Sequence, residues 1–263
     1  MLCFLPDGDE LRYGTVRRSF LFPLSYALYK SGPLTAFRRY FAVRRQLAQY
    51  RYMLNGSDDV RATDLDLWLV DDLQSAGNAD GYFYQDTWFA RKLFAARPNY
   101  HVDIGSQLIS IGIISQLIPT TYVDVRKLDI HLPDLEFRQG SLEALPFETE
   151  SIESISSLNV IEHCGLGRYG DPLDPLGSDK ACAEISRVSK SGGSIYVAVP
   201  TEKKTRTCFN ANRIFNPDDL LSKFSGIKLI EEAYTTVHGM ANRKQYEQLG
   251  MPYSYGCFHL RKR

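Results

Sequence analysis

Two acidic residues at the ends of neighbouring apolar segments are the first places where this sequence could do chemistry. Asp103 precedes Gly105 and Ser106 at the end of a strand expected over 100–104, and Asp124 ends the next such segment 21 residues later. A glycine turn that leads into a helix offers free backbone amides, and a carboxylate about 20 residues further on can accept both hydroxyls of a ribose. Together the two features indicate a site for an adenosine-bearing ligand.

A histidine and two further acids follow in the second half of the chain. His163 stands beside Glu162 at the expected end of a fourth strand, where an imidazole can take a proton from a hydroxyl group at neutral pH. The loop 164–177 is rich in glycine and proline and is therefore not a regular helix. It carries Asp171 and Asp174, which could orient the imidazole or an acceptor. A structural role for His163, ordering the start of the next helix, remains equally open.

The same loop carries residues that suit a sugar. Arg168 and Tyr169 follow His163 closely and combine a polar group with an aromatic face, so they are candidate substrate contacts. A divalent ion on Asp171 and Asp174 is the alternative use of the loop. Two carboxylates three residues apart more often belong to a turn, so no metal is predicted.

The elements that must position these residues alternate between strands and helices. Strands are expected over 100–104, 120–125, 136–138, 154–158, 194–199, 227–237 and 256–261, and helices over 82–96, 108–117, 178–189 and 217–224. Such alternation implies βαβ units and a mostly parallel, doubly wound α/β sheet. Because no helix is expected between the last two strands, we expect them to form an antiparallel edge pair. Asp86 or Thr87 is the expected N-cap of the first of these helices, and Asn216 that of the last.

Three motifs resemble the class I S-adenosylmethionine-dependent methyltransferases. They are the GSLEALPF of 140–147, the strand segment 151–163 that ends in NVIEH, and 185–193 with its double glycine before a strand that ends in Val199-Pro200. The resemblance covers roughly residues 85–263. It implies a Rossmann-like, seven-stranded, mostly parallel sheet with an antiparallel last strand, and S-adenosylmethionine as the cofactor. Segments 165–175 and 209–213 are similar to a narrower, uncharacterised family, domain of unknown function 268.

The resemblance also implies site residues. The cofactor candidates are Asp103, Gly105, Ser106, Asp124, Val125, Ser141, Leu142 and Asn159, and the further substrate candidates are Asn210 and Arg213. The chain departs from the usual pattern where Gln107 and Ile109 replace the later glycines of the first motif, and where Ser141 stands in place of an aspartate. A pocket that still binds cofactor must have room beside Gln107 and Ile109.

Charge is balanced over the chain but not along it. Lys plus Arg and Asp plus Glu each number 31, so a whole-chain electrostatic case for nucleic-acid binding fails. The segment 15–56 holds eight basic residues and no acid, and a helix is expected over 33–54. This helix either lies on an anionic membrane surface or packs on its own domain with solvated arginines outside. We therefore expect a basic then acidic helical extension over 1–84 and the α/β domain over 85–263.

The sequence thus predicts a cytoplasmic S-adenosylmethionine-dependent O-methyltransferase. We expect no signal peptide and no membrane span, and five widely spaced cysteines suit reduced thiols. The expected acceptor is a sugar or another hydroxylated metabolite, in surface-glycan assembly. The alternative is a catalytically silent methyltransferase-like module that binds a partner or a membrane surface through residues 15–56.

Overall fold

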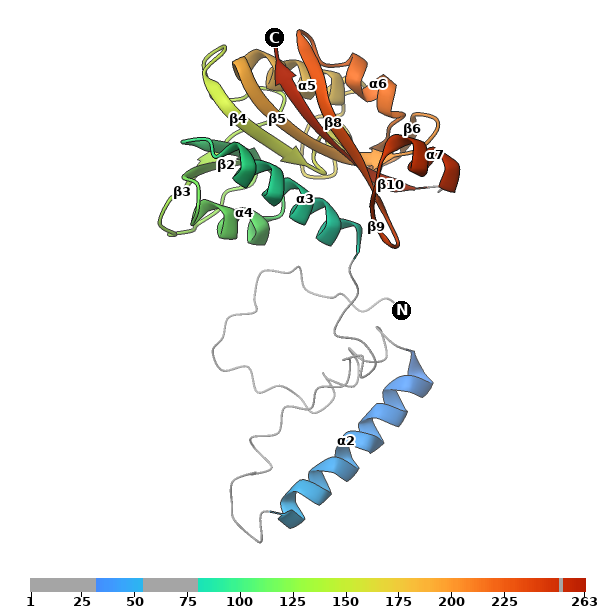
Figure 1. Cartoon of the computed structure of the whole chain (residues 1–263). Coiled ribbons are helices and arrows are strands. Elements are labelled where there is room, and N and C mark those ends of the chain that lie inside the picture. Colours follow the sequence, from blue (N-terminus) through green and yellow to red (C-terminus); the bar gives the residue numbers. More distant parts are fainter. Residues whose placement is uncertain (1–31, 54–79, 251–252) are drawn as a thin grey trace. The chain divides into compact units, whose positions relative to one another are not determined.

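A computed structural model of the chain describes residues 32–53, 80–250 and 253–263 (Figure 1). The chain divides into two units, Met1–Asn78 and Ala79–Arg263, which are described separately. In the first unit, helix α2 (Pro33–Met53) has Pro33 in its first turn, and its predicted end at residue 54 lies outside the described residues. The rest of the basic segment 15–56 lies outside the described residues. Within the described ranges, no helix has the length and apolar character needed to cross a membrane.

The second unit is built around a sheet of eight strands in the spatial order β3-β2-β1-β4-β5-β10-β8-β9. The strands are β1 (His101–Ile104), β2 (Thr120–Asp124), β3 (Leu135–Gln139), β4 (Ile152–Leu158), β5 (Ser189–Thr201), β8 (Ile227–Thr236), β9 (Gly239–Ala241) and β10 (Ser254–Lys262). Strands β1 to β5 pair in parallel, and β10 is antiparallel to both of its neighbours. The predicted doubly wound, mostly parallel sheet with an antiparallel last strand is confirmed.

The last strands differ from the prediction in their placement. Strand β10 does pair antiparallel with β8, but it lies between β5 and β8 instead of at the edge. Its buried Phe258 and Cys257 belong to the core clusters on opposite faces of the sheet, which a central strand requires. The edge is β9, one strand more than the seven expected, and helix α7 (Arg243–Leu249) separates β9 from β10.

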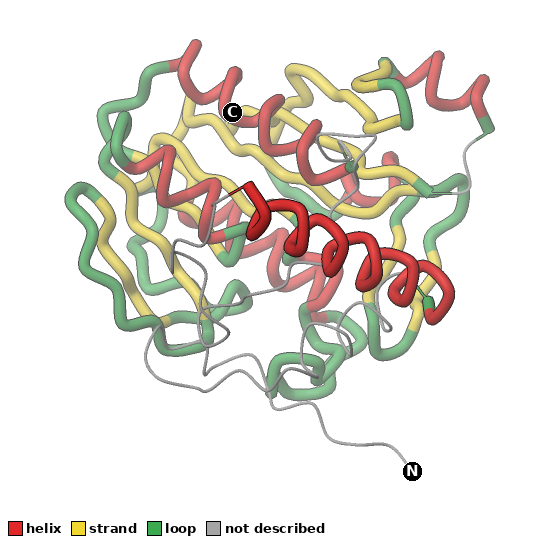
Figure 2. The backbone as a smooth tube through the Cα atoms, turned by 90° about the horizontal axis from the view of Figure 1, so that it is seen from below, coloured by secondary structure: helices red, strands yellow, loops and turns green. Residues whose placement is uncertain are grey.

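Helices cover both faces of the sheet. Helices α3 (Gly81–Ala96) and α4 (Leu108–Ser115) bury Phe89 and Ile111 against one face, and α5 (Gly177–Val188) and α6 (Pro217–Ser222) pack on the other (Figure 1). Side chains of β5 alternate between the two core clusters, with Val197 in one and Tyr196 in the other. Figure 2 shows the strands of this unit from below, with helices on both sides of them.

Helix starts follow local capping residues, with one correction. Helix α3 begins at Gly81 because the Asp80 carboxylate accepts a hydrogen bond from the Phe83 amide at 2.9 Å, so the predicted N-caps Asp86 and Thr87 lie inside the helix. Asn216 caps α6 as predicted, accepting from two amides of the first turn. A hairpin that the sequence did not indicate, β6 (Arg206–Cys208) with β7 (Asn212–Ile214), precedes α6.

Candidate functional site

A pocket lies at the carboxyl ends of β1, β2 and β4, beside the 3-10 helix η2 (Ile161–His163). The strand order reverses between β1 and β4, so this is the switch point where doubly wound sheets bind ligands. Of the predicted site residues, Gly105, Asp124, Val125, Ser141, Leu142, Asn159, His163, Tyr169 and Asp171 line the pocket.

The turn after β1 is held by the two predicted cofactor residues that do not line the pocket. The Ser106 amide and hydroxyl donate to the buried Asp103 carboxylate at 3.1 and 2.7 Å. This turn places Gly105 at a φ of +66°, and a Cβ there would lie 3.1 Å from Cγ1 of Val160. Burial raises the pKa of Asp103 to about 7, against the lowering effect of its hydrogen bonds to Ser156 and Ser106. Asp103 and Ser106 therefore shape the pocket from beneath its lining.

Asp124 presents its carboxylate at the tip of β2, but another side chain already occupies it. The Arg126 guanidinium donates to both carboxylate oxygens, at 3.0 and 2.8 Å, and the Arg126 amide adds a third bond at 2.8 Å. Burial alone would raise the pKa of Asp124, and these bonds more than offset that effect, so the pKa lies below its usual value. The oxygens that a ribose would need are bound by the chain itself.

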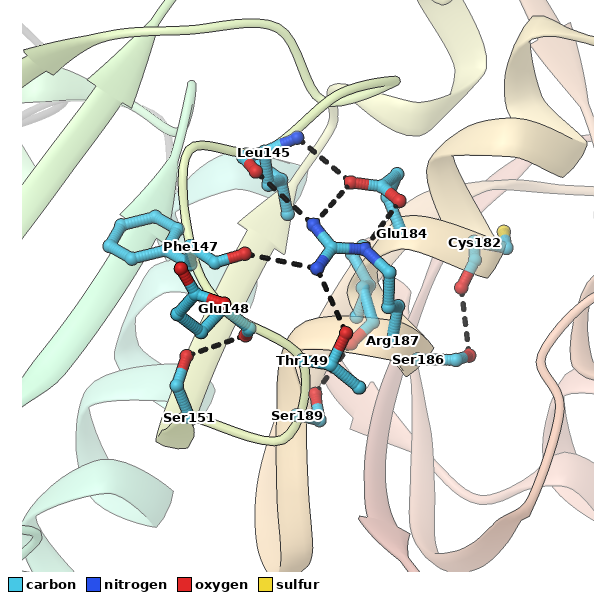
Figure 3. Close-up of polar contacts among 11 residues, drawn as sticks. Leu145, Phe147, Glu148, Thr149, Ser151, Cys182, Glu184, Ser186, Arg187 and Ser189 are labelled. Carbon is cyan, nitrogen blue, oxygen red and sulfur yellow. Dashed lines mark hydrogen bonds and ion pairs between the residues drawn. The ribbon is translucent and has the colours of Figure 1, made fainter.

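Ser141 and Leu142 reach the pocket from a loop that α5 holds in place. Arg187 donates to the Leu145 and Phe147 carbonyls at 3.2 and 3.0 Å and to both carboxylate oxygens of Glu184 (Figure 3). The Glu184 carboxylate in turn accepts from the Leu145 amide at 2.9 Å. The EALPF motif thus has a structural role, because its backbone is bonded to α5.

Asn159 contributes an unsatisfied polar atom. The residue has a φ of +58°, and its side-chain amide donates to Gln85 of α3 at 2.9 Å. Its Oδ1 is buried and lacks a hydrogen-bond partner in the part of the chain that the structure describes. A buried acceptor of this kind is commonly completed by a ligand or an ordered water.

The two departures from the glycine motif do not obstruct the pocket. Gln107 is exposed and precedes α4, and the Ile109 side chain is 78% exposed on that helix. Neither residue lines the pocket. Their side chains therefore do not occupy the described pocket.

His163 lies on the pocket wall with a defined orientation. Its Nδ1 is 2.8 Å from the Ala211 carbonyl oxygen, and because a carbonyl only accepts, the neutral ring carries its proton on Nδ1. Nε2 keeps its lone pair and lies 3.8 Å from Oε1 of Glu162. Burial lowers the pKa of His163 below 6.5, with a further lowering by the charge of Arg168 and smaller raising effects from the Ala211 bond and Asp171. The imidazole is therefore neutral at pH 7.

The two loop acids have different surroundings. The Asp171 carboxylate lines the pocket and accepts from the amides of Gly165, Gly167 and Tyr169 at 2.8, 3.2 and 3.1 Å. Asp174 does not line the pocket, and its carboxylate pairs with Lys180 instead. The structure thus uses Asp171 to fold the loop and pairs Asp174 with Lys180 outside the pocket lining. No group of three or more potential metal ligands occurs among the described residues.

The predicted substrate residues also differ in whether they line the pocket. Tyr169 lines the pocket with its ring edge-on to His163, and the guanidinium groups of Arg168 and Arg126 lie 5.3 and 5.2 Å from its centroid. Arg168 also donates to the Ala211 carbonyl at 2.9 Å. Tyr169 and Arg126 line the pocket, and Arg168 lies beside Tyr169 without lining it; we call these three side chains the rim.

Arg213 has a structural role in place of the predicted contact to substrate. It is 7% exposed and donates to the Cys164, Asp174 and Pro175 carbonyls and to the Ser178 hydroxyl. These bonds use its guanidinium to fasten the loop 164–177. Asn210 lies in the turn of the β6–β7 hairpin and does not line the pocket.

Sequence reasoning gave no role to Arg126, which lines the pocket, or to Glu162, which lies beside His163. Arg126 was not singled out although it stands two residues after Asp124, a spacing that allows the bidentate pair. Glu162 was quoted as part of the NVIEH motif but received no role. Its burial, which depends on neighbours far apart in the sequence, was the missing information.

The chain is similar to three solved structures. They are the [4+2]-cyclase SpnF (14% identity, TM-score 0.49, 67% of this chain and 81% of that chain), a putative S-adenosylmethionine-dependent methyltransferase from Listeria monocytogenes (10%, 0.46, 68% and 98%) and geranyl diphosphate C-methyltransferase from Streptomyces coelicolor A3(2) (11%, 0.47, 67% and 77%). The last was solved with Mg²⁺, geranyl diphosphate and S-adenosyl-L-homocysteine. A comparison with the curated proteins finds no match.

The family comparison concerns a segment that supplies most of the residues lining the pocket. Residues 138–249 match the family described as "Caenorhabditis protein of unknown function, DUF268". The match extends from the end of β3 to the end of α7, and it includes the motifs at 140–147 and 151–163 and the loop 164–177. Residues 138–249 of this chain are therefore similar to the DUF268 family, in agreement with the resemblance predicted from the motifs of this segment.

Proposed function

We propose that the chain is an S-adenosylmethionine-dependent methyltransferase that methylates a hydroxyl group of a sugar or of another hydroxylated metabolite. The observation that carries the proposal is the pocket at the switch point, which gathers Asp124, the Gly105 turn and Asn159 Oδ1, an atom without a partner among the described residues. Doubly wound sheets bind nucleotide-bearing ligands at this place.

The residues present fit an adenosine if one side chain moves. Asp124 would accept the two ribose hydroxyls, and the Ser141 hydroxyl would contact the adenine amino group. Asn159 Oδ1 would gain the donor that it lacks. Arg126 must leave Asp124, and because its side chain is 63% exposed it can turn into solvent at small cost.

Methyl transfer to a hydroxyl group would require the chain to hold the acceptor and to remove its proton. S-adenosylmethionine, when bound, supplies a methyl group that is already activated by its positively charged sulfur. His163 is placed to take the acceptor's hydroxyl proton at Nε2, because the Ala211 bond fixes its tautomer and burial keeps it neutral at pH 7. Holding the acceptor in line contributes further to the rate.

The nature of the acceptor is supported by the rim. Tyr169 offers an aromatic face, and Arg168 adds hydrogen-bond donors beside His163. A hydroxylated ring uses both kinds of contact, and we place the reaction in surface-glycan assembly in the cytoplasm.

One observation favours the silent module as a second candidate. Arg126 binds both oxygens of the carboxylate that a ribose would need, as it would in a retained fold with a closed pocket. In that case the chain would act by binding a partner or a membrane surface, with residues 15–56 as the contact.

Calorimetric titration of the full chain with S-adenosylmethionine and S-adenosylhomocysteine separates the two candidates. We expect binding of both, and a loss of about tenfold or more in Asp124→Ala, since bonds to a charged group are worth ~1.5–3 kcal/mol each. Glu136→Ala, which removes an exposed carboxylate from the neighbouring strand β3, is the control and should leave the dissociation constant unchanged. Absence of binding in the wild type favours the silent module.

A further inference from the structure

Arg126 has two partners at the pocket, and a bound cofactor would take only one of them. Its guanidinium donates to both carboxylate oxygens of Asp124 at 3.0 and 2.8 Å, and it also lies 5.2 Å from the centre of the Tyr169 ring. A ribose that binds Asp124 would displace the guanidinium from the carboxylate and leave the ring in place. The cation–π contact with Tyr169 would then hold a free positive charge at the pocket wall.

The Tyr169 ring also connects Arg126 with the proposed base. His163 lies edge-on to this ring with 5.5 Å between the ring centres, and all three side chains line the pocket. The guanidinium of Arg168 lies 5.3 Å from the same ring centre, although it does not line the pocket. An acceptor whose hydroxyl faces His163 would therefore lie in a part of the pocket with a positive charge in its wall and a second one nearby.

The released charge requires a new partner, and the fork of Arg126 suits an oxyanion. The loop acid Asp171 already accepts from three backbone amides, at 2.8, 3.2 and 3.1 Å, so its hydrogen-bonding needs are met without the guanidinium. A guanidinium can bind two oxygens of one carboxylate or phosphate group at once. The pair with Asp124 has this two-point geometry, through Nε and Nη2 of Arg126.

We propose that the acceptor is a hydroxylated molecule that carries an oxyanion, as a uronic acid or a sugar phosphate does, and that Arg126 binds this oxyanion once the ribose has displaced it from Asp124. The inference rests on the proposed function and names its substrate class. Binding is then ordered, because the cofactor frees the guanidinium that the acceptor needs. Without cofactor, the Asp124 carboxylate competes with the acceptor for Arg126.

Ligand-observed NMR titration of the full chain tests this preference without requiring turnover. The probes are methyl glucuronoside and glucose 1-phosphate, which are anionic at pH 7, and methyl glucoside, which is neutral. With S-adenosylhomocysteine present, we expect at least one anionic probe to bind about fivefold more tightly than methyl glucoside, since one exposed ion pair is worth up to that factor. The anionic probe that is preferred distinguishes a carboxylate from a phosphate.

Two outcomes for the wild type would contradict the proposal. Binding of neither anionic probe more tightly than methyl glucoside, with S-adenosylhomocysteine present, overturns the oxyanion site. A preference of equal size with and without S-adenosylhomocysteine overturns the ordered displacement.

A matched pair of variants assigns the preference to Arg126. Arg126→Met should bind the anionic and neutral probes with equal affinity. Arg138→Met is the control, because Arg138 also binds both carboxylate oxygens of an acid two residues away, Glu136, and lies 5.4 Å from the centre of an aromatic ring, that of Phe147. Arg138 does not line the pocket, so this variant should keep the wild-type preference. A preference that persists in Arg126→Met overturns the proposal.

Asp124→Asn tests the oxyanion site without any cofactor. The variant removes the charge that holds the guanidinium, and it keeps an oxygen for the backbone amide of Arg126. We expect it to prefer the anionic probe in the absence of S-adenosylhomocysteine about as strongly as the wild type does in its presence. The double variant Asp124→Asn/Arg126→Met should show no preference.

This variant also keeps the two proposals apart. If S-adenosylhomocysteine fails to bind the wild type but Asp124→Asn prefers the anionic probe through Arg126, the methyltransferase proposal fails and the oxyanion site stands. If S-adenosylhomocysteine binds but Asp124→Asn shows no such preference, the oxyanion site fails and the methyltransferase proposal stands.

Discussion

The two sides of the pocket are built by different means. On the side of β1 to β3, Gly105 and Asp124 sit at the ends of strands, so the sheet itself fixes their backbone. On the side of η2, the loop 164–177 has no strand to hold it and depends on side chains: Asp171 binds three of its amides and Arg213 binds three carbonyls.

The difference extends to the polar groups that a ligand would meet. The acid on the strand side, Asp124, is ionised and already paired with Arg126. The acid on the loop side, Glu162, is neutral and has an oxygen without a partner in the described chain. The strand side must therefore release the Arg126 contact before a ligand can bind Asp124, whereas the acid on the other side lies behind the pocket lining. We expect mutations to act on affinity at the first and on turnover and stability at the second.

The largest effect is expected at His163 on the loop side. His163→Ala removes the proton acceptor and should lower turnover by ~10²–10⁴, measured as S-adenosylhomocysteine released in the presence of a mixture of methyl glycosides. Wild-type turnover should rise with pH as the imidazole loses its proton. Because burial lowers the pKa of His163, the midpoint of that rise should lie below 6.5, and it should be absent from the variant.

Cofactor affinity decides whether His163 is catalytic or structural. If it is the base, the dissociation constant of S-adenosylhomocysteine should hardly change in His163→Ala, because the imidazole faces the acceptor. A joint loss of stability and cofactor affinity would show instead that the bond from Nδ1 to the Ala211 carbonyl holds the site together.

The second effect concerns the fastening of the loop. Arg213→Met leaves the Cys164, Asp174 and Pro175 carbonyls without a buried charged donor. At ~1.5–3 kcal/mol for each bond to a charged group, we expect the free energy of unfolding to fall by about 3 kcal/mol or more. Urea denaturation measures this loss. Arg138→Met breaks an exposed pair with Glu136 and should cost less than about 1 kcal/mol; similar losses in the two variants would contradict the fastening role.

The sequence predicts the strand side of the site better than the loop side. Asp103, Gly105 and Asp124 stand at the ends of apolar runs, and strand ends are visible in a local pattern. The role of Arg213 is not, because its partner Cys164 is 49 residues away and only the folded chain brings them together. The sequence also does not place β10. Its position between β5 and β8 buries apolar residues on both of its faces, and only the folded chain identifies its two neighbours. Asp171 and Asp174 look alike in sequence and separate only through their partners, three amides for one and Lys180 for the other.

The smallest effect, and the sharpest test of the strand side, is expected at Arg126. If its guanidinium competes with the ribose for Asp124, Arg126→Met should bind S-adenosylhomocysteine more tightly than the wild type. The pair is exposed on the arginine side, so its release is worth no more than about 1 kcal/mol, or about fivefold in the dissociation constant.

Salt provides an independent check on this competition. An exposed pair is screened as ionic strength rises above ~0.15 M, so wild-type affinity should move toward that of Arg126→Met, while the variant itself stays nearly constant. Arg138→Met removes the arginine of an exposed ion pair on the neighbouring strand β3. Its affinity for S-adenosylhomocysteine should depend on salt as that of the wild type does. A higher dissociation constant for S-adenosylhomocysteine in Arg126→Met than in the wild type would mean that the guanidinium contacts the cofactor instead of excluding it.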